Sequence, residues 1–196
     1  VKRNNISISI VFEKLNIGFQ NFFVTNKRIK NISRNFFIFF NNSLNPFFEM
    51  RFFIQLESFT ADIIEPLGGI KDVTPFLTSL IDSSLLFTNI YSSGFRTDQG
   101  LVTMMSAFPA QPNVSIIWQN NKAEKLPTIT EQLAEKNYHT SFFYGGDLGF
   151  SNMKAYVLHN GYENIFGEDD LGSKENFGKW GAPDEAVFDK QLSFLQ

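Results

Sequence analysis

Short apolar runs alternate with segments of helical spacing from about residue 52 to the end of the chain. The apolar runs are short enough to be buried strands, and they cover residues 52–56, 86–91 and 139–144. Apolar residues recur every three or four positions in the segments between them, at 76–85, 98–107, 129–134, 152–160 and 183–194. Such alternation predicts an α/β fold, in which helices cover the faces of a parallel sheet.

Local signals mark several ends of these helices. Thr74-Pro75 is a helix start, with Thr as the N-cap and Pro in the first turn. Thr128 and Glu131 have the spacing of a capping box, which opens the helix that follows. Gly161 is placed to end the helix that precedes it.

The first part of the chain has a different composition. Residues 1–55 hold eight Lys or Arg and two acidic residues, and they are dense in Asn and Phe. We find no helical or alternating period running through residues 1–50, and asparagine is a poor former of regular elements. We therefore expect residues 1–50 to be a poorly ordered basic leader. The alternative is a basic, aromatic segment that binds anionic lipid or nucleic acid.

Overall composition narrows the classes of function. The 196 residues include no cysteine, which excludes a disulfide framework, a zinc–thiolate cluster and a cysteine nucleophile. A net charge of −3 argues against a general nucleic-acid binder, and we expect no nucleic-acid partner. The longest apolar run in the leader, Phe36 to Phe40, is far too short to cross a bilayer, and no signal peptide is recognisable. Any attachment to a membrane would depend on segments absent from this chain.

Polar residues follow each of the three predicted strands. They are Glu57-Ser58 after the first, Gly94 to Asp98 after the second and Gly145 to Asp147 after the third. Because ligands of open α/β sheets bind beyond the carboxyl ends of the strands, these three segments predict one site at one edge of the sheet.

The motifs at these positions, taken in order, resemble the lipoteichoic acid synthase-like branch of the sulfatase and alkaline phosphatase superfamily. They are Leu56-Glu57-Ser58-Phe59, Val73 to Leu80, Gly94 to Gly100, Pro109-Ala110-Gln111-Pro112, Tyr144-Gly145-Gly146-Asp147 with Phe150 to Met153, and Trp180-Gly181 followed by Asp184. Residues 51–196 are thereby identified as the N-terminal part of a sulfatase-type catalytic domain, while residues 1–50 match no family. The resemblance implies a three-layer α/β/α sandwich around a mainly parallel sheet, incomplete at its C-terminus.

The resemblance also assigns roles to individual residues. Glu57 and Thr97 correspond to ligands of one divalent metal, for which manganese is the first expectation and magnesium the second. Thr97 corresponds to the nucleophile, and a hydroxyl at the amino end of a helix, next to a metal, suits that role. Oxygen donors fit either cation better than a soft metal. The substrate pocket is expected to include Arg96, Asp147, Phe150 and Asn152.

Two departures from the family pattern change the expected activity. No Cys/Ser-x-Pro-x-Arg motif surrounds residue 97, so sulfate ester hydrolysis through an oxidised nucleophile is not expected. The family's later Asp-His metal ligands are also missing, and neither His139 nor His159 follows an Asp. With part of the metal shell absent, we expect little or no turnover from these residues alone. An incomplete sheet would also leave an open edge through which chains associate.

Several functional hypotheses follow from these observations. The first is a metal-dependent transferase of the phosphoglycerol type, or an ester hydrolase, that acts on a lipid head group at the outer face of a bacterial cytoplasmic membrane. A phosphoethanolamine transferase is an alternative. A non-catalytic fragment, or a module that binds glycan or lipid, is another. Taken alone, Thr97 could be an ordinary N-cap and Glu57 an ordinary surface acid.

Overall fold

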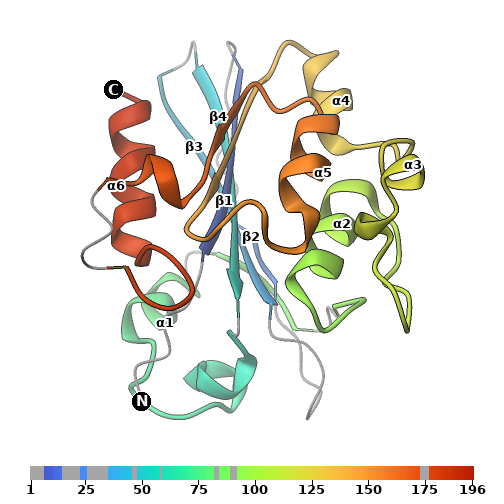
Figure 1. The fold of residues 1–196 in the computed structure, drawn as a ribbon. Coiled ribbons are helices and arrows are strands. Elements are labelled where there is room, and N and C mark those ends of the chain that lie inside the picture. The colour runs from blue at the N-terminus through green and yellow to red at the C-terminus, as the bar shows by residue number, and fades with distance from the viewer. Residues whose placement is uncertain are drawn as a thin grey trace.

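A seven-stranded sheet lies between two groups of helices, with α6 and α1 on one side and α2 to α5 on the other (Figure 1). This computed structural model describes residues 7–14, 23–25, 35–45, 48–57, 59–81, 84–88, 92–172 and 177–196. The strands are β1 (Ser7–Lys14), β2 (Phe23–Thr25), β3 (Asn35–Asn45), β4 (Phe48–Glu57), β5 (Leu85–Phe87), β6 (His139–Tyr144) and β7 (Asn164–Phe166). The helices are α1 (Pro75–Ile81), α2 (Thr97–Ser106), α3 (Asn120–Ala123), α4 (Ile129–Ala134), α5 (Met153–His159) and α6 (Asp184–Phe194). Short 3₁₀ turns connect them at Ala61–Ile63, Glu65–Leu67, Ile116–Trp118, Phe150–Asn152 and Glu168–Asp170.

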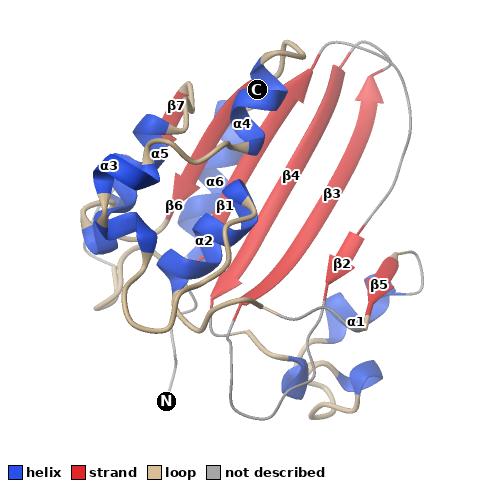
Figure 2. Ribbon diagram, turned by 90° about the vertical axis from the view of Figure 1, so that its right-hand side faces the viewer, coloured by secondary structure: helices blue, strands red, loops and turns tan. Residues whose placement is uncertain are grey.

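The direction of the strands matters for the site. The order across the sheet is β5-β2-β3-β4-β1-β6-β7, and the long strands β3 and β4 are prominent in Figure 2. β5 pairs parallel with β2, and β6 pairs parallel with β7. β1 and β3 pair antiparallel with each of their neighbours. The other five described strands, β2 and β4 to β7, therefore all run in the same direction.

The predicted α/β fold, with helices on both faces of the sheet, is thus present. A mainly parallel sheet was predicted, and five of the seven described strands do run in one direction. Most of the hydrogen-bonded pairs are nevertheless antiparallel, because β1 and β3 run in the opposite direction and lie between members of this parallel set. Both opposed strands come from residues 1–50.

Residues 1–50 thus contribute three strands where the sequence analysis expected no regular element. The segment Ser7–Lys14 has a reason to extend, since Ile8, Ile10 and Phe12 occupy alternate positions. β3 is rich in Phe, which favours strands, and its pairing with β4 runs along most of both strands.

Strand β4 shows how its two faces pack. Phe53 packs against a core cluster that contains Leu101, Val102 and Met105 of α2. Phe52, on the opposite face, packs against a second core cluster, which includes Val187 of α6. Ile54 and Leu56 pack against a third cluster, which includes Leu77 of α1. Alternation along the strand therefore assigns the odd-numbered positions of β4 to the face covered by α2.

The predicted helix signals are confirmed where they are local. In α4, the Glu131 backbone N–H donates to Thr128 Oγ1 at 3.3 Å, and the Thr128 N–H donates to Glu131 Oε2 at 3.0 Å, which completes the capping box. Gly161 follows α5 with a φ of 71°.

Other predicted boundaries differ. The helix predicted over 76–85 ends at Ile81, because Leu85 begins β5. The strand predicted over 86–91 is β5, which ends at Phe87, and residues 89–91 lie outside the described residues. The edge strand β7 was not predicted.

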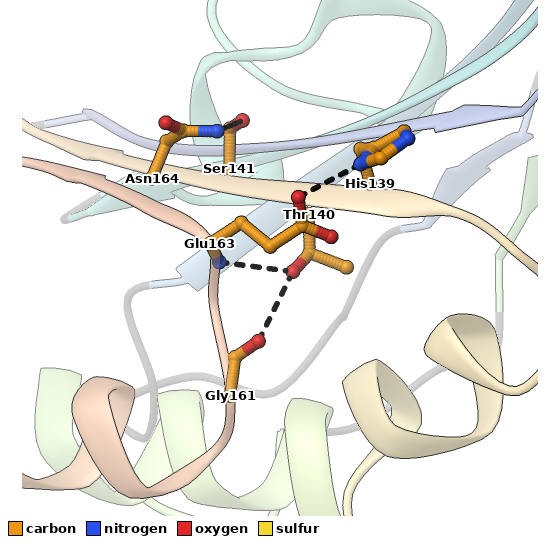
Figure 3. Close-up of polar contacts among 6 residues, drawn as sticks. All are labelled: His139, Thr140, Ser141, Gly161, Glu163 and Asn164. Atoms are coloured by element: carbon orange, nitrogen blue, oxygen red, sulfur yellow. Dashed lines mark hydrogen bonds and ion pairs between the residues drawn. The ribbon is translucent and has the colours of Figure 1, made fainter.

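Polar contacts tie the amino end of β6 to the segment that leads into β7 (Figure 3). His139 Nδ1 lies 2.7 Å from Glu163 Oε2, and the Glu163 backbone N–H donates to Thr140 Oγ1 at 3.4 Å. His139 is at the amino end of its strand, so it lies away from the edge at which the predicted site residues follow β4, β5 and β6. This network has a structural role, as expected for His139.

Candidate functional site

The three strands that precede the predicted site segments end at the same edge of the sheet. β4 ends at Glu57, β5 at Phe87 and β6 at Tyr144, and all three run in one direction. The backbone of Glu57 closes β4, at an odd-numbered position and so on the α2 side. The side chain of Glu57 lies outside the described residues, and so does Ser58. The predicted pairing of Glu57 with Thr97 therefore stays a prediction.

The loop before α2 is held in place by the side chain of Gln99. The Phe95 backbone N–H donates to Gln99 Oε1 at 3.2 Å, and Gln99 Nε2 donates to the Gln111 carbonyl at 3.1 Å. A second link joins the same two segments, since the Ala110 backbone N–H donates to Ser93 Oγ at 2.7 Å. These contacts fix the backbone that leads into Thr97, so the position of its hydroxyl is built into the fold.

Thr97 is the first residue of α2, and the N-cap position belongs to Arg96. The alternative that Thr97 is only an N-cap therefore does not describe this helix. Thr97 is 8% exposed, so its hydroxyl is largely shielded from bulk water at the positive end of a ten-residue helix. This environment suits a hydroxyl that must lose a proton or meet a phosphate group.

Arg96 and Phe95 are exposed beside Thr97. The Arg96 guanidinium lies over the Phe95 ring, 5.5 Å from its centroid, and 56% of Phe95 is exposed. Arg96 is thus a solvent-facing cation next to the predicted nucleophile. Its predicted contact with substrate is untested.

The loop after β6 places Asp147 at the same edge. Asp147 is exposed, and its Oδ1 accepts a hydrogen bond from the Gly149 backbone N–H at 2.7 Å. A backbone hydrogen bond ties this loop to the segment before α6, since the Ala182 N–H donates to the Gly145 carbonyl at 2.6 Å. Gly181, with a φ of 116°, passes so close that an added Cβ would overlap the Gly145 carbonyl oxygen. The Trp180-Gly181 motif therefore shapes the loop that presents Asp147.

The two remaining predicted pocket residues differ in their surroundings. Phe150 is 51% exposed, as an apolar contact for substrate would be. Asn152 is engaged within the protein, since its Nδ2 donates to the Ile117 carbonyl and to Asn120 Oδ1, both at 2.6 Å. These bonds give Asn152 a structural role, and its predicted contact with substrate stays a prediction.

Sequence reasoning missed Gln55, and it included Asp98 in a predicted site segment without giving it a role of its own. Gln55 is 0% exposed and Asp98 is 2% exposed. Gln55 had one available signal, because it is a polar residue inside an otherwise apolar predicted strand. Asp98 lies in the predicted segment Gly94 to Asp98, but nothing marked it individually, since an acidic residue in the first turn of a helix is common.

The donor chemistry near Thr97 fits the divalent cation that the resemblance implies. In the part of the chain that is described, no three His, Cys, Asp or Glu side chains gather into a metal site. Asp98, the residue after Thr97, has an Oδ2 that is buried without a hydrogen-bond partner among those residues. A carboxylate oxygen and a hydroxyl are both donors that suit a hard cation such as Mn²⁺ or Mg²⁺.

No helix in the described ranges has both the length and the apolar character needed to span a bilayer.

Comparison with known proteins agrees with the sequence motifs. Residues 51–196 match the family model described as Sulfatase. Over 152 residues, 74% of this chain is 27% identical to lipoteichoic acid synthase 2 of Bacillus subtilis (strain 168), of which it covers 23%. Over 148 residues, it is 21% identical to the lipoteichoic acid synthase-like protein YvgJ of the same organism, of which it covers 24%. The chain thus spans about a quarter of the length of these curated relatives.

A solved structure supports the fold. The chain is similar to the crystal structure of a protein in the alkaline phosphatase superfamily from Vibrio parahaemolyticus, with a TM-score of 0.63 and 31% identity. The match covers 69% of this chain and 33% of that one. The match to the Sulfatase family model begins in β4 and extends through α6, so it includes every described element that contributes to the site. This chain therefore belongs to the sulfatase family, in the lipoteichoic acid synthase-like branch of the alkaline phosphatase superfamily.

Proposed function

We propose that this chain carries the nucleophile of a metal-dependent transferase or hydrolase of phosphoric esters, with Thr97 as the attacking residue. Its family supports phosphoester transfer or hydrolysis as the class of reaction. We place its substrate among lipids with a phosphoglycerol-type head group, on the model of the relatives named as lipoteichoic acid synthases.

The environment of Thr97 is the observation that carries this proposal. The residue is buried at the first position of α2, behind a loop fixed by Gln99, at the edge where β4, β5 and β6 end. The helix end favours negative charge, both on a threonine alkoxide and on a bound phosphate. The loops after three parallel strands meet at this edge, and ligands of open α/β sheets bind at such an edge.

The reaction follows from the chemistry of a threonine nucleophile. Thr97 Oγ1 forms a bond to the phosphorus of the head group while the bond from phosphorus to the lipid alcohol breaks. The Thr97 proton passes to the departing lipid alkoxide. An acceptor hydroxyl, or water, then forms a bond to the same phosphorus while the bond from phosphorus to Thr97 Oγ1 breaks, and its proton returns to Thr97 Oγ1.

We assign the remaining predicted residues around this step. Glu57 and Thr97 would hold one divalent cation, Mn²⁺ in the first instance and Mg²⁺ in the second. Such a cation stabilises a coordinated alkoxide and offsets charge on the phosphate oxygens. Arg96 would pair with those oxygens, while Asp147, Phe150 and Asn152 would line the head group.

The expected setting is the outer face of a bacterial cytoplasmic membrane, where lipid head groups are available. The relatives named as lipoteichoic acid synthases support this placement. Self-association through a sheet edge also stays a proposal; the edge strands of the described sheet are β5 and β7.

The test follows the first half of the reaction, because that step leaves a covalent group on Thr97 that can be measured. The full chain is mixed with Mn²⁺ and phosphatidylglycerol in detergent, quenched in acid and measured by intact mass spectrometry with peptide mapping. We expect a covalent phosphoglycerol group on Thr97, its complete loss in Thr97→Ala, and its retention in Thr97→Ser. Thr103→Ala is the matched control, since Thr103 lies in the same helix and its hydroxyl donates to the Phe108 carbonyl.

An adduct that forms equally in Thr97→Ala, or none in the unmodified chain, would contradict the proposal. Transfer from phosphatidylethanolamine in preference to phosphatidylglycerol would point to the phosphoethanolamine alternative. Lipid binding that ignores both Mn²⁺ and Thr97→Ala would point to a non-catalytic binding module.

A further inference from the structure

The carboxylate of Asp98 is buried without a full set of partners. Asp98 is 2% exposed, and its Oδ2 has no hydrogen-bond partner among the described residues. Ion pairs among the described residues include His139 with Glu163 and His159 with Glu124. A buried carboxylate is costly in free energy unless a cation or hydrogen bonds compensate for it.

Helical spacing places Asp98 on the inner face of α2. Leu101, Val102 and Met105 form the part of this helix that belongs to the large core cluster. Asp98 precedes Leu101 by three residues and Val102 by four, so it lies on the same stripe, one turn nearer the amino end. Asp98 therefore lies on the stripe of α2 that continues from the core, and it is buried there.

Strand β4 carries a second buried polar side chain without hydrogen-bond partners. Gln55 is fully buried, and neither its Oε1 nor its Nε2 has a hydrogen-bond partner among the described residues. Gln55 is two positions beyond Phe53, on the face that packs against the cluster of α2. One step of two strand residues covers about 7 Å, and one helical turn covers about 5 Å. Gln55 and Asp98 therefore each continue a buried face toward the carboxyl edge of the sheet.

These two groups flank the residues predicted to bind the cation. Gln55 comes two positions before Glu57 in β4, and Asp98 comes one position after Thr97 in α2. A hydrated divalent cation would satisfy both orphaned groups at once. It would pair with the carboxylate, and the waters it keeps would bond to the amide oxygen and nitrogen.

We propose that Asp98 is a further oxygen ligand of the divalent cation, with the amide of Gln55 bonded to the water that the cation retains. This inference rests on the proposed function, since it concerns the same cation. It adds to the site of Thr97 two buried polar residues, Asp98 of α2 and Gln55 of β4, which we call the polar layer. Arg96 does not serve as the counter-charge, because it is exposed and stacked on Phe95.

The test measures Mn²⁺ binding and thermal unfolding of the full chain, with no substrate present. Asp98→Asn keeps the shape of the side chain and removes its charge. We expect the dissociation constant for Mn²⁺, followed by electron paramagnetic resonance, to rise roughly tenfold or more in Asp98→Asn. Without metal, the melting temperature should rise in Asp98→Asn, because an uncompensated buried charge has been removed. At the same Mn²⁺ concentration, the unmodified chain should gain more stability than Asp98→Asn.

Glu135→Gln is the matched control. It removes one carboxylate at an exposed position after α4, and it should behave like the unmodified chain in both measurements. Asp98→Ala provides a second variant with no polar side chain, and it should show the same loss of Mn²⁺ binding.

Two results would overturn the inference in different ways. Unchanged Mn²⁺ binding in Asp98→Asn and Asp98→Ala would exclude Asp98 as a ligand while leaving the Thr97 adduct intact. Failure of the unmodified chain to bind Mn²⁺ would remove both this inference and the metal dependence of the proposed function.

Discussion

At the scale of single residues, burial separates Thr97 and Asp98 from Phe95 and Arg96, the exposed residues that precede them. The family motif indicates Thr97, and its place at the start of α2 agrees with the predicted helix. The burial of Gln55 and Asp98 is not evident from the sequence, because it depends on how the elements pack around β4 and α2. That packing joins segments more than forty residues apart, and no local pattern encodes it.

Gln99 offers a prediction about the support of Thr97. Gln99→Ala removes the bonds to the Phe95 N–H and the Gln111 carbonyl. We expect a loss of about 1–3 kcal/mol in the free energy of unfolding, measured by urea denaturation, because two backbone groups lose their partner. Gln132→Ala, at an exposed position of α4, should cost much less. Equal losses in the two variants would show that Gln99 does not hold the loop.

Tyr162 gives a prediction about pH. Burial raises the pKa of its hydroxyl well above the ordinary value, and the hydroxyl donates to Met105 Sδ at 2.8 Å. As pH rises through about 10, the unfolded chain releases this proton while the folded chain retains it, so folding stability falls. Denaturation at increasing pH should show a steeper decline in the unmodified chain than in Tyr162→Phe. Parallel declines would contradict this assignment.

At the scale of elements, agreement between sequence and structure follows the range of the signal. The capping box of α4 lies within four residues, and the structure reproduces it. The apolar spacing of α1 continues to Leu85, yet the helix stops at Ile81 and Leu85 pairs with Phe23 of β2. Spacing alone cannot distinguish a last helical turn from the first residue of a strand.

The contact between Gly181 and Gly145 supports a prediction about the loop after β6. Gly181→Ala must place a Cβ against the Gly145 carbonyl, at a backbone conformation that alanine rarely adopts. We expect it to cost about 2–4 kcal/mol in the free energy of unfolding. Gly172→Ala is the control, since Gly172 also has a positive φ but nothing lies within 4 Å of an added Cβ. It should cost about 1 kcal/mol, and a cost as large as that of Gly181→Ala would refute the role of the close contact.

At the scale of the whole molecule, the sequence predicts the layers of the fold but not the full sheet. Alternation of strands and helices from residue 52 indicates the α/β arrangement, and the family match covers the same region. β1 and β3 were missed because the partner of a strand is set by pairing across the fold. The alternating Ile8, Ile10 and Phe12 and the apolar run from Phe36 to Phe40 were local signs of extended segments in that part.

The polar layer formed by Gln55 and Asp98 has a consequence for laboratory evolution of this protein. A library screened only for heat resistance should enrich an amide at position 98 and apolar side chains at both positions, because such replacements remove a buried charge or unpartnered polar atoms. Variants selected in that way should resist heat but bind manganese more weakly. A screen that also demands manganese capture should keep both original residues.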